Sequence, residues 1–181
     1  METKRLVKAA KQGDKAAMVK LIMLQKEEYY KLAYVYMKNK EDALDAMEDM
    51  IISIYDNIYG LRDESAFYSW SKTILVNRCK GLLKAKNKIR VLAHKEEHAH
   101  TEEQAYEGDI QQKEDRLLLE QYLSQLNQKH QEVIRLRYFL DLDYKTIADL
   151  LKIPLGTVKS RISTGLNKLK ECLGGEEHAR S

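Results

Sequence analysis

Cysteine, proline and long apolar runs are scarce in this chain, and each scarcity excludes a class of protein. The 181 residues include two cysteines, Cys79 and Cys172, which lie far apart without the spacing of a metal or redox site. We therefore expect a reduced, cytosolic protein. No apolar run approaches the roughly 18 residues of a membrane-spanning helix. The N-terminus has no apolar core of the kind that a signal peptide needs.

The scarcity of helix-breaking residues indicates an all-α fold. The chain has one proline, Pro154, and eight glycines, and it is rich in Leu, Lys, Glu, Ala and Ile. No alternating apolar pattern bounded by turn residues predicts a strand. We expect two small helical domains, residues 1–93 and 113–173, joined by a flexible linker at 94–112. This linker is polar and acidic and has too little apolar content to pack.

Breaks in the apolar pattern divide the two domains into helices. In the first domain we expect a short opening helix, then one long helix from about residue 15 to 37. A second long helix runs from about 41 to 59 and ends at Gly60, a suitable C-cap. A loop at 61–64 precedes a third long helix. The second domain has helices near 114–126 and 129–140 and a helical pair at 143–170, before a frayed tail at 174–181.

Charge is distributed in blocks, although the net charge is only +3. Residues 65–93 hold seven bases and no acid, and residues 152–170 hold five bases and no acid. Two basic blocks indicate two contacts with nucleic acid. Residues 41–64 hold eight acids and one base, which would repel phosphate, so a basic protein partner explains this block better.

Residues 143–170 have the pattern of a helix-turn-helix. The first helix presents an apolar patch, and Pro154 lies where the second helix should begin. The second helix repeats apolar residues at Val158, Ile162, Leu166 and Leu169, while Gly156, Ser160, Ser163 and Asn167 face the opposite way. Lys159, Lys170, Arg161 and Lys168 flank this polar face. Such a helix fits the major groove of DNA, although a solvated basic α-hairpin is the simpler alternative.

The amino-acid sequences of three segments resemble motifs of extracytoplasmic-function (ECF) sigma factors of the sigma-70 family. DYKTIA followed by IPLGTVKSR, within 143–161, is similar to the motif that reads the −35 element. RDESAFYSW and ILVN, within 62–77, are similar to the module that reads the −10 element. Asp45, Glu48 and Asp49 fall on the family's acidic polymerase-binding pattern. A weaker resemblance, in YKLAYVYMKNKEDALDAMED and KNKIRV, is to Gram-positive envelope-stress members.

The resemblance implies a transcription initiation factor, not an enzyme, that acts in a stress response without a cofactor, metal or small-molecule substrate. Its implied partners are core RNA polymerase (β′ clamp coiled coil and β flap), promoter DNA (duplex at −35, single-stranded at −10) and an anti-sigma factor, membrane-bound in this family. The implied contacts form three sets. The −35 set is Thr157, Lys159, Ser160, Arg161, Ser163 and Thr164. The −10 set is Arg62, Glu64, Ser65, Ala66, Phe67, Asn77, Arg78 and Lys84. The polymerase set is Asp45, Glu48, Asp49, Ile52 and Ser53.

Some residues allow more than one interpretation. Trp70 is more readily a core residue than a stacking surface for a base, and Phe67 and Tyr68 are better candidates for stacking. The linker histidines, His94, His98 and His100, could bind metal but have no fixed scaffold. Three residues depart from the family pattern: Asp63 replaces a glycine, Thr164 replaces an arginine, and Gly165 replaces an alanine at a helix-propensity cost of about 1 kcal/mol.

Two other classes of protein remain open from the residues alone. A helix-turn-helix regulator would bind duplex DNA without polymerase, usually as a dimer on spaced half-sites. A sigma-like antagonist would occupy polymerase without reading DNA. An enzyme is the least favoured class, because the sequence has no nucleophile–base pair, phosphate-binding glycine loop or zinc spacing.

Overall fold

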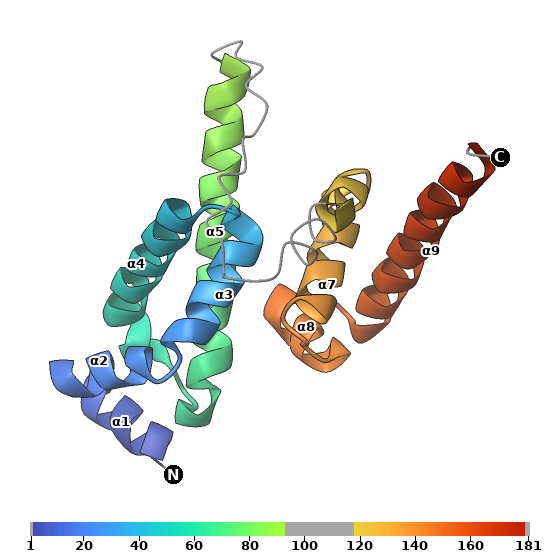
Figure 1. Ribbon diagram of the computed structural model, residues 1–181. Helices are drawn as coiled ribbons and strands as arrows, with labels where there is room; N and C mark the ends of the chain where they lie inside the picture. The colour runs from blue at the N-terminus through green and yellow to red at the C-terminus, as the bar shows by residue number, and fades with distance from the viewer. Residues whose placement is uncertain (1, 93–117, 180–181) are drawn as a thin grey trace. The chain divides into compact units, whose positions relative to one another are not determined.

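The computed structural model describes residues 2–92 and 118–179 and divides the chain into two compact units, Met1–Glu102 and Glu103–Ser181 (Figure 1). The described residues form helices, turns and loops and contain no strand. The expected all-α fold with a helix-turn-helix in the second unit is therefore confirmed. The linker histidines lie outside the described residues.

The first unit has five α-helices and two 3₁₀ turns among its described residues. They are α1 (Glu2–Lys11), α2 (Lys15–Met23), α3 (Lys26–Met37), α4 (Lys40–Asn57), η1 (Ile58–Gly60), η2 (Glu64–Ala66) and α5 (Phe67–Leu92). Asp14 and Asn39 cap α2 and α4, because their side-chain oxygens accept hydrogen bonds from the amides of Ala17 and Asp42. Helix α5 has 26 residues and extends beyond the N-terminal end of α4 (Figure 1).

The single helix expected from residue 15 to 37 is wrong, because the chain turns at Leu24 and Gln25. Gln25 leaves the helical region with φ −124° and ψ 15°. Nothing in the local sequence marks this break, since the segment has no glycine or proline and its apolar stripe stays in register. The cause is tertiary: α2 packs against α1, whereas α3 packs against α4 and α5.

The core of the first unit lies where α3, α4 and α5 meet. Tyr29, Met50, Ile54 and Leu75 are fully buried there. The hydroxyl groups of Tyr29 and Ser71 share a buried hydrogen bond of 2.7 Å that joins α3 to α5. Burial raises the pKa of the Tyr29 phenol, although the Ser71 hydrogen bond opposes this. The core thus supports α5 along its first half.

The second unit contains a helical segment at 118–124, then α7 (Gln128–Tyr138), α8 (Tyr144–Leu151) and α9 (Leu155–Ala179). Helix α8 ends at Lys152, whose left-handed backbone (φ 56°) turns the chain toward Pro154 and the start of α9. Helix α9 continues to Ala179, so the frayed tail expected from residue 174 is helical over most of its length.

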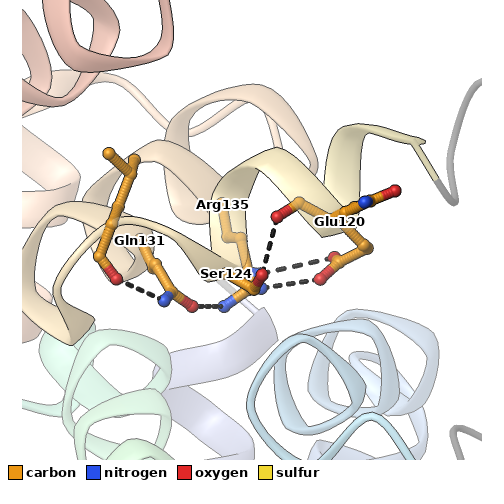
Figure 2. A network of polar contacts seen from close by, with 6 residues as sticks. Glu120, Ser124, Gln131 and Arg135 are labelled. Carbon is orange, nitrogen blue, oxygen red and sulfur yellow. Dashed lines mark hydrogen bonds and ion pairs between the residues drawn. The ribbon is translucent and has the colours of Figure 1, made fainter. Parts of the chain in front are cut away.

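A partly buried polar network joins the 118–124 segment to α7 (Figure 2). Arg135, which is 7% exposed, donates from Nη2 to Glu120 Oε2 at 2.7 Å and from Nη1 to Gln131 Oε1 at 2.9 Å. Gln131 in turn donates to the carbonyl of Leu126 at 2.7 Å. Together with the apolar cluster of Tyr122, Leu123, Leu126, Ile134 and Leu169, this network fixes α7 as the support for α9.

Candidate nucleic-acid interface

The outward face of α9 is polar and cationic. Val158 and Ile162 are buried against the rest of the unit, while Lys159, Ser160 and Ser163 are exposed. The remaining members of the expected −35 set are also on the surface: Thr164 is exposed, and Thr157 and Arg161 are half-buried. The helix therefore presents short hydroxyl side chains between cations.

Helix α8 holds α9 through an apolar face and begins at a capped end. Ile147, Ala148 and Leu150 are buried. Asp143 accepts hydrogen bonds from the Thr146 amide at 2.9 Å and from the Thr146 hydroxyl at 2.8 Å. These bonds lower the pKa of the Asp143 carboxyl, so the carboxylate stays ionised as a cap.

Gly165 has a role that sequence reasoning missed. A Cβ atom at this position would lie 2.6 Å from Ile134 Cδ1 and 3.3 Å from His130 Cβ, so glycine allows α7 and α9 to approach closely. The glycine is buried, not on the outward face. His130 Nδ1, also on α7, is buried without a hydrogen-bond partner among the described residues. Burial, and then the charges of Lys168 and Arg161, lower the pKa of His130.

In the first unit, a side chain of α1 holds the loop at 61–66 in place. Lys11 Nζ donates to the Leu61 carbonyl at 2.9 Å and lies 3.3 Å from Glu64 Oε1. Hydrogen bonds from the backbone amide of Glu64 and from Lys11 lower the pKa of the Glu64 carboxyl. The expected DNA contact at Glu64 thus has its carboxylate engaged within the protein.

Asp63 shapes the same loop. Its φ of −113° is extended, so the position does not need the glycine of the family pattern. Asp63 Oδ1 accepts from the Ser65 amide at 2.9 Å and from the Ser65 hydroxyl at 2.6 Å, which caps η2. Arg62 and Ser65 are exposed and Ala66 is half-buried, so three of the expected −10 residues lie at the loop surface.

Phe67, expected as a −10 contact and as a candidate for stacking, lies in the core of the first unit. Its side chain is 0% exposed, and its ring lies 5.2 Å from that of Tyr68 and 6.1 Å from that of Trp70. Phe67 is the first residue of α5 and anchors that helix in the core. Tyr68 and Trp70 are half-buried, so each is partly accessible beside the loop.

Beyond the loop, α5 carries an exposed cationic surface. Asn77 and Lys84 are both exposed and lie seven residues apart, which places them on one face of the helix. Arg78 Nη2 donates to Ser53 Oγ of α4 at 3.3 Å, and Lys86 pairs with Asp42 of α4. The structure thus brings together Arg78 of the expected −10 set and Ser53 of the expected polymerase set.

Helix α4 separates a buried apolar side from an acidic outer side. Ala43, Met47, Met50 and Ile54 are among its buried residues. The expected polymerase contacts lie away from this side: Asp45, Glu48 and Ile52 are exposed, and Asp49 and Ser53 are half-buried. Ile52 is 61% exposed, which places an apolar side chain among the acids.

The described residues contain no cluster of three or more His, Cys, Asp or Glu that could hold a metal ion. Within the same ranges, no helix is long and apolar enough to cross a membrane. The outward face of α9 and the basic surface of α5 define a helix-turn-helix protein with a second basic helix.

Comparison with known proteins assigns the family. Residues 21–89 match the family described as Sigma-70 region 2, and residues 122–171 match Sigma-70, region 4. The chain is 30% identical over 170 residues to the RNA polymerase sigma factor SigV of Bacillus subtilis, and the aligned region covers 92% of this chain and 97% of that protein. It is 28% identical over 184 residues to the ECF RNA polymerase sigma factor SigW of the same organism, with coverage of 96% and 97%. This chain belongs to the ECF group of the sigma-70 family of RNA polymerase sigma factors.

Solved structures agree on the fold. CnrH, solved in complex with the cytosolic domain of CnrY, superposes with a TM-score of 0.67 at 16% identity, covering 97% of this chain and 99% of that one. The sigma factor RpoE of Bartonella quintana, solved with the anti-sigma factor NepR, gives 0.66 at 20% identity, covering 84% and 94%.

Proposed function

We propose that this sigma factor directs core RNA polymerase to specific promoters by binding two elements at once. Residues 113–173 bind the −35 element as duplex, and residues 1–93 capture the melted −10 element as single strand, with 94–112 as the connection. The observation that carries this proposal is the outward face of α9, where hydroxyl side chains lie between cations. The polymerase supplies the chemistry, and this chain is not an enzyme.

Recognition of the −35 element follows from the side chains of that face. Lys159 and Arg161 are suited to phosphates, since cations supply most of the affinity for duplex DNA. Ser160, Ser163 and Thr164 are short enough to reach base edges in the major groove. The half-buried Thr157 lies at the start of α9, where its hydroxyl is suited to a phosphate.

Capture of the −10 strand uses the loop and α5. The amide of Asn77 can donate to and accept from a base edge. Lys84 and Arg78 supply positive charge along the strand, and Arg62, Ser65 and Ala66 border the site for an unpaired base. Phe67 supports this surface from the core, and Glu64 acts through its ion pair with Lys11.

The acidic side of α4 is the proposed contact with polymerase. Asp45, Glu48 and Asp49 attract a basic surface, Ser53 adds a polar contact, and the exposed Ile52 adds apolar area to bury. The implied surface is the β′ clamp coiled coil, with the β flap as the contact of the second unit.

An anti-sigma factor is the proposed inhibitor. RpoE, a sigma factor of similar fold, was solved with the anti-sigma factor NepR, and CnrH, also of similar fold, was solved with the cytosolic domain of CnrY. The two units of this chain would be held by a partner of the same kind, in the cytoplasm and close to the membrane if the partner is anchored there. A stress response is the proposed setting.

In vitro transcription tests this function. Purified core polymerase is combined with the full chain on a pool of genomic promoters, and transcript starts are mapped. We expect new starts that need the protein and that disappear with Asn77→Ala or with deletion of residues 143–173. Asn87→Ala changes an exposed asparagine of the same helix outside the proposed contacts and serves as the matched control. Duplex binding without new starts would support a helix-turn-helix regulator, and polymerase binding without starts would support an antagonist.

A further inference from the structure

Lys11, the last residue of α1, reaches the loop at 61–66 and binds it at two points. Its ammonium donates to the Leu61 carbonyl at 2.9 Å and forms an ion pair with Glu64 at 3.3 Å. The side chains of Lys11 and Glu64 are only 24% and 22% exposed. One cation therefore ties the backbone before the loop tip to a carboxylate after it.

The position of this ammonium is set by a docked helix. Leu6, Val7 and Ala10 of α1 are buried, and α1 packs against η1 and η2 as well as α2. At its other end, Glu2 forms an ion pair of 2.7 Å with Lys20 of α2. Because α1 is anchored along its length, the position of this helix fixes where the Lys11 ammonium contacts the loop.

The tip of the loop has mostly local support. Arg62, Asp63 and Ser65 are exposed, and the hydrogen bonds of Asp63 to Ser65 close only the turn of η2. Leu61 is buried at one end and Phe67 at the other. Between these anchors, the bonds from Lys11 select one backbone path across the loop.

We propose that Lys11 is a positioning residue for base recognition in the −10 strand: it holds the 61–66 loop in the shape that receives the unpaired base, without touching DNA. This inference rests on the proposed function. Helix α1 lies outside the residues that match Sigma-70 region 2, so this control comes from a part of the chain that the family match does not include.

Losing the Lys11 bonds should weaken binding of the correct −10 base more than binding of an incorrect base at the same position. A loop with several backbone paths binds in proportion to the fraction in the competent shape. Contacts of the strand with Asn77 and Lys84 on α5 do not depend on that shape. Affinity for the correct base therefore falls while backbone affinity remains, and discrimination between bases decreases.

The test uses promoters found by the transcription experiment, with each −10 base and each −35 base changed in turn. For each variant, transcription from the matched promoter is divided by transcription from the mismatched one. If the competent fraction falls to about a tenth, Lys11→Met lowers this ratio about tenfold at the loop-contacted −10 base and leaves the −35 ratios unchanged. Lys11→Arg retains the cation and the ratio. Arg5→Met, at an exposed cation of the same helix away from the loop, is the matched control and leaves both ratios unchanged.

Equal −10 ratios for Lys11→Met and Arg5→Met would overturn the proposal, and so would an equal loss at −10 and −35. Unfolding monitored by Trp70 fluorescence checks that the first unit is folded. If Lys11→Met unfolds it, Glu64→Gln removes the ionic partner alone, and we expect a smaller loss confined to −10; no loss would overturn the proposal. A wild-type protein that yields no new starts would instead refute the proposed function.

Discussion

Replacing Arg135 with methionine should unfold the second unit under conditions in which the first remains folded. Arg135 is nearly buried, with a side chain 9% exposed, and it binds both Glu120 and Gln131 (Figure 2). Methionine retains the apolar stem but removes every donor. Glu120 then loses its ion pair with Arg135, and Gln131 loses a hydrogen bond.

The size of the effect follows from the burial of the two partners. Breaking a fully buried ion pair costs about 3–5 kcal/mol. Glu120 is 30% exposed, so water partly solvates the carboxylate left behind, and we expect about 2–3 kcal/mol. At about 0.05–0.15 kcal/mol per residue, a unit of about 60 residues has only about 3–9 kcal/mol of stability. The loss is thus a large share of the total.

Urea denaturation can separate the two units because Trp70 is the only tryptophan and lies in the first unit. Its fluorescence reports the first unit, while far-UV circular dichroism reports both. We expect Arg135→Met to move the second unit's transition to lower urea and to leave the fluorescence transition in place. Lys129→Met, at an exposed cation of α7, is the control. A cost below about 1 kcal/mol would contradict the assigned role, since that is the value of an exposed pair.

Three further predictions concern other buried groups. Gly165→Ala gains about 1 kcal/mol of helix propensity but loses about 1–3 kcal/mol by overpacking, so the second unit should become less stable. Combining it with Ile134→Val, which removes the clashing Cδ1 atom, should give a double mutant more stable than the sum of the two changes; strict additivity in urea denaturation would contradict this contact. Burial raises the pKa of the Cys79 thiol to about 12, so a thiol reagent at neutral pH should modify the half-buried Cys172 first, and equal labelling rates would refute this. The pKa of His130 is lowered in the folded state, so the unfolded chain binds more protons than the folded chain below about pH 6.5. The free energy of unfolding should therefore decrease as the pH is lowered through that range. His130→Gln should reduce this fall when urea midpoints are compared at neutral and mildly acidic pH, and an unchanged fall would refute it.

Much of the fold could be predicted from local patterns. The helix-turn-helix follows from the apolar spacing of Val158 and Ile162 and from Pro154, because a helix buries one face and proline favours the start of the next helix. The acidic helix could be predicted in the same way, since Met47, Met50 and Ile54 form a continuous apolar side. In both cases the signal lies within one helix, so no knowledge of its neighbours is needed.

The candidate site was harder to predict where a residue acts through a distant one. Phe67 resembles a stacking residue because it lies beside an exposed loop, and only the fold shows that it is fully buried. Glu64 falls in the motif, yet its carboxylate binds Lys11, 53 residues away in sequence. No spacing rule connects two such positions.

Composition and periodicity predict an all-helical chain with a basic recognition helix, a second basic helix and an acidic outer helix, and the short motifs resemble those of ECF sigma factors. These features depend on composition, periodicity and short motifs, which are local properties of the chain. Three features emerge from the three-dimensional packing: residues 15–37 form two helices, Gly165 allows α7 to approach α9, and Lys11 holds the 61–66 loop. Each of these depends on contacts between residues far apart in sequence, because packing against different partners overrides local preference.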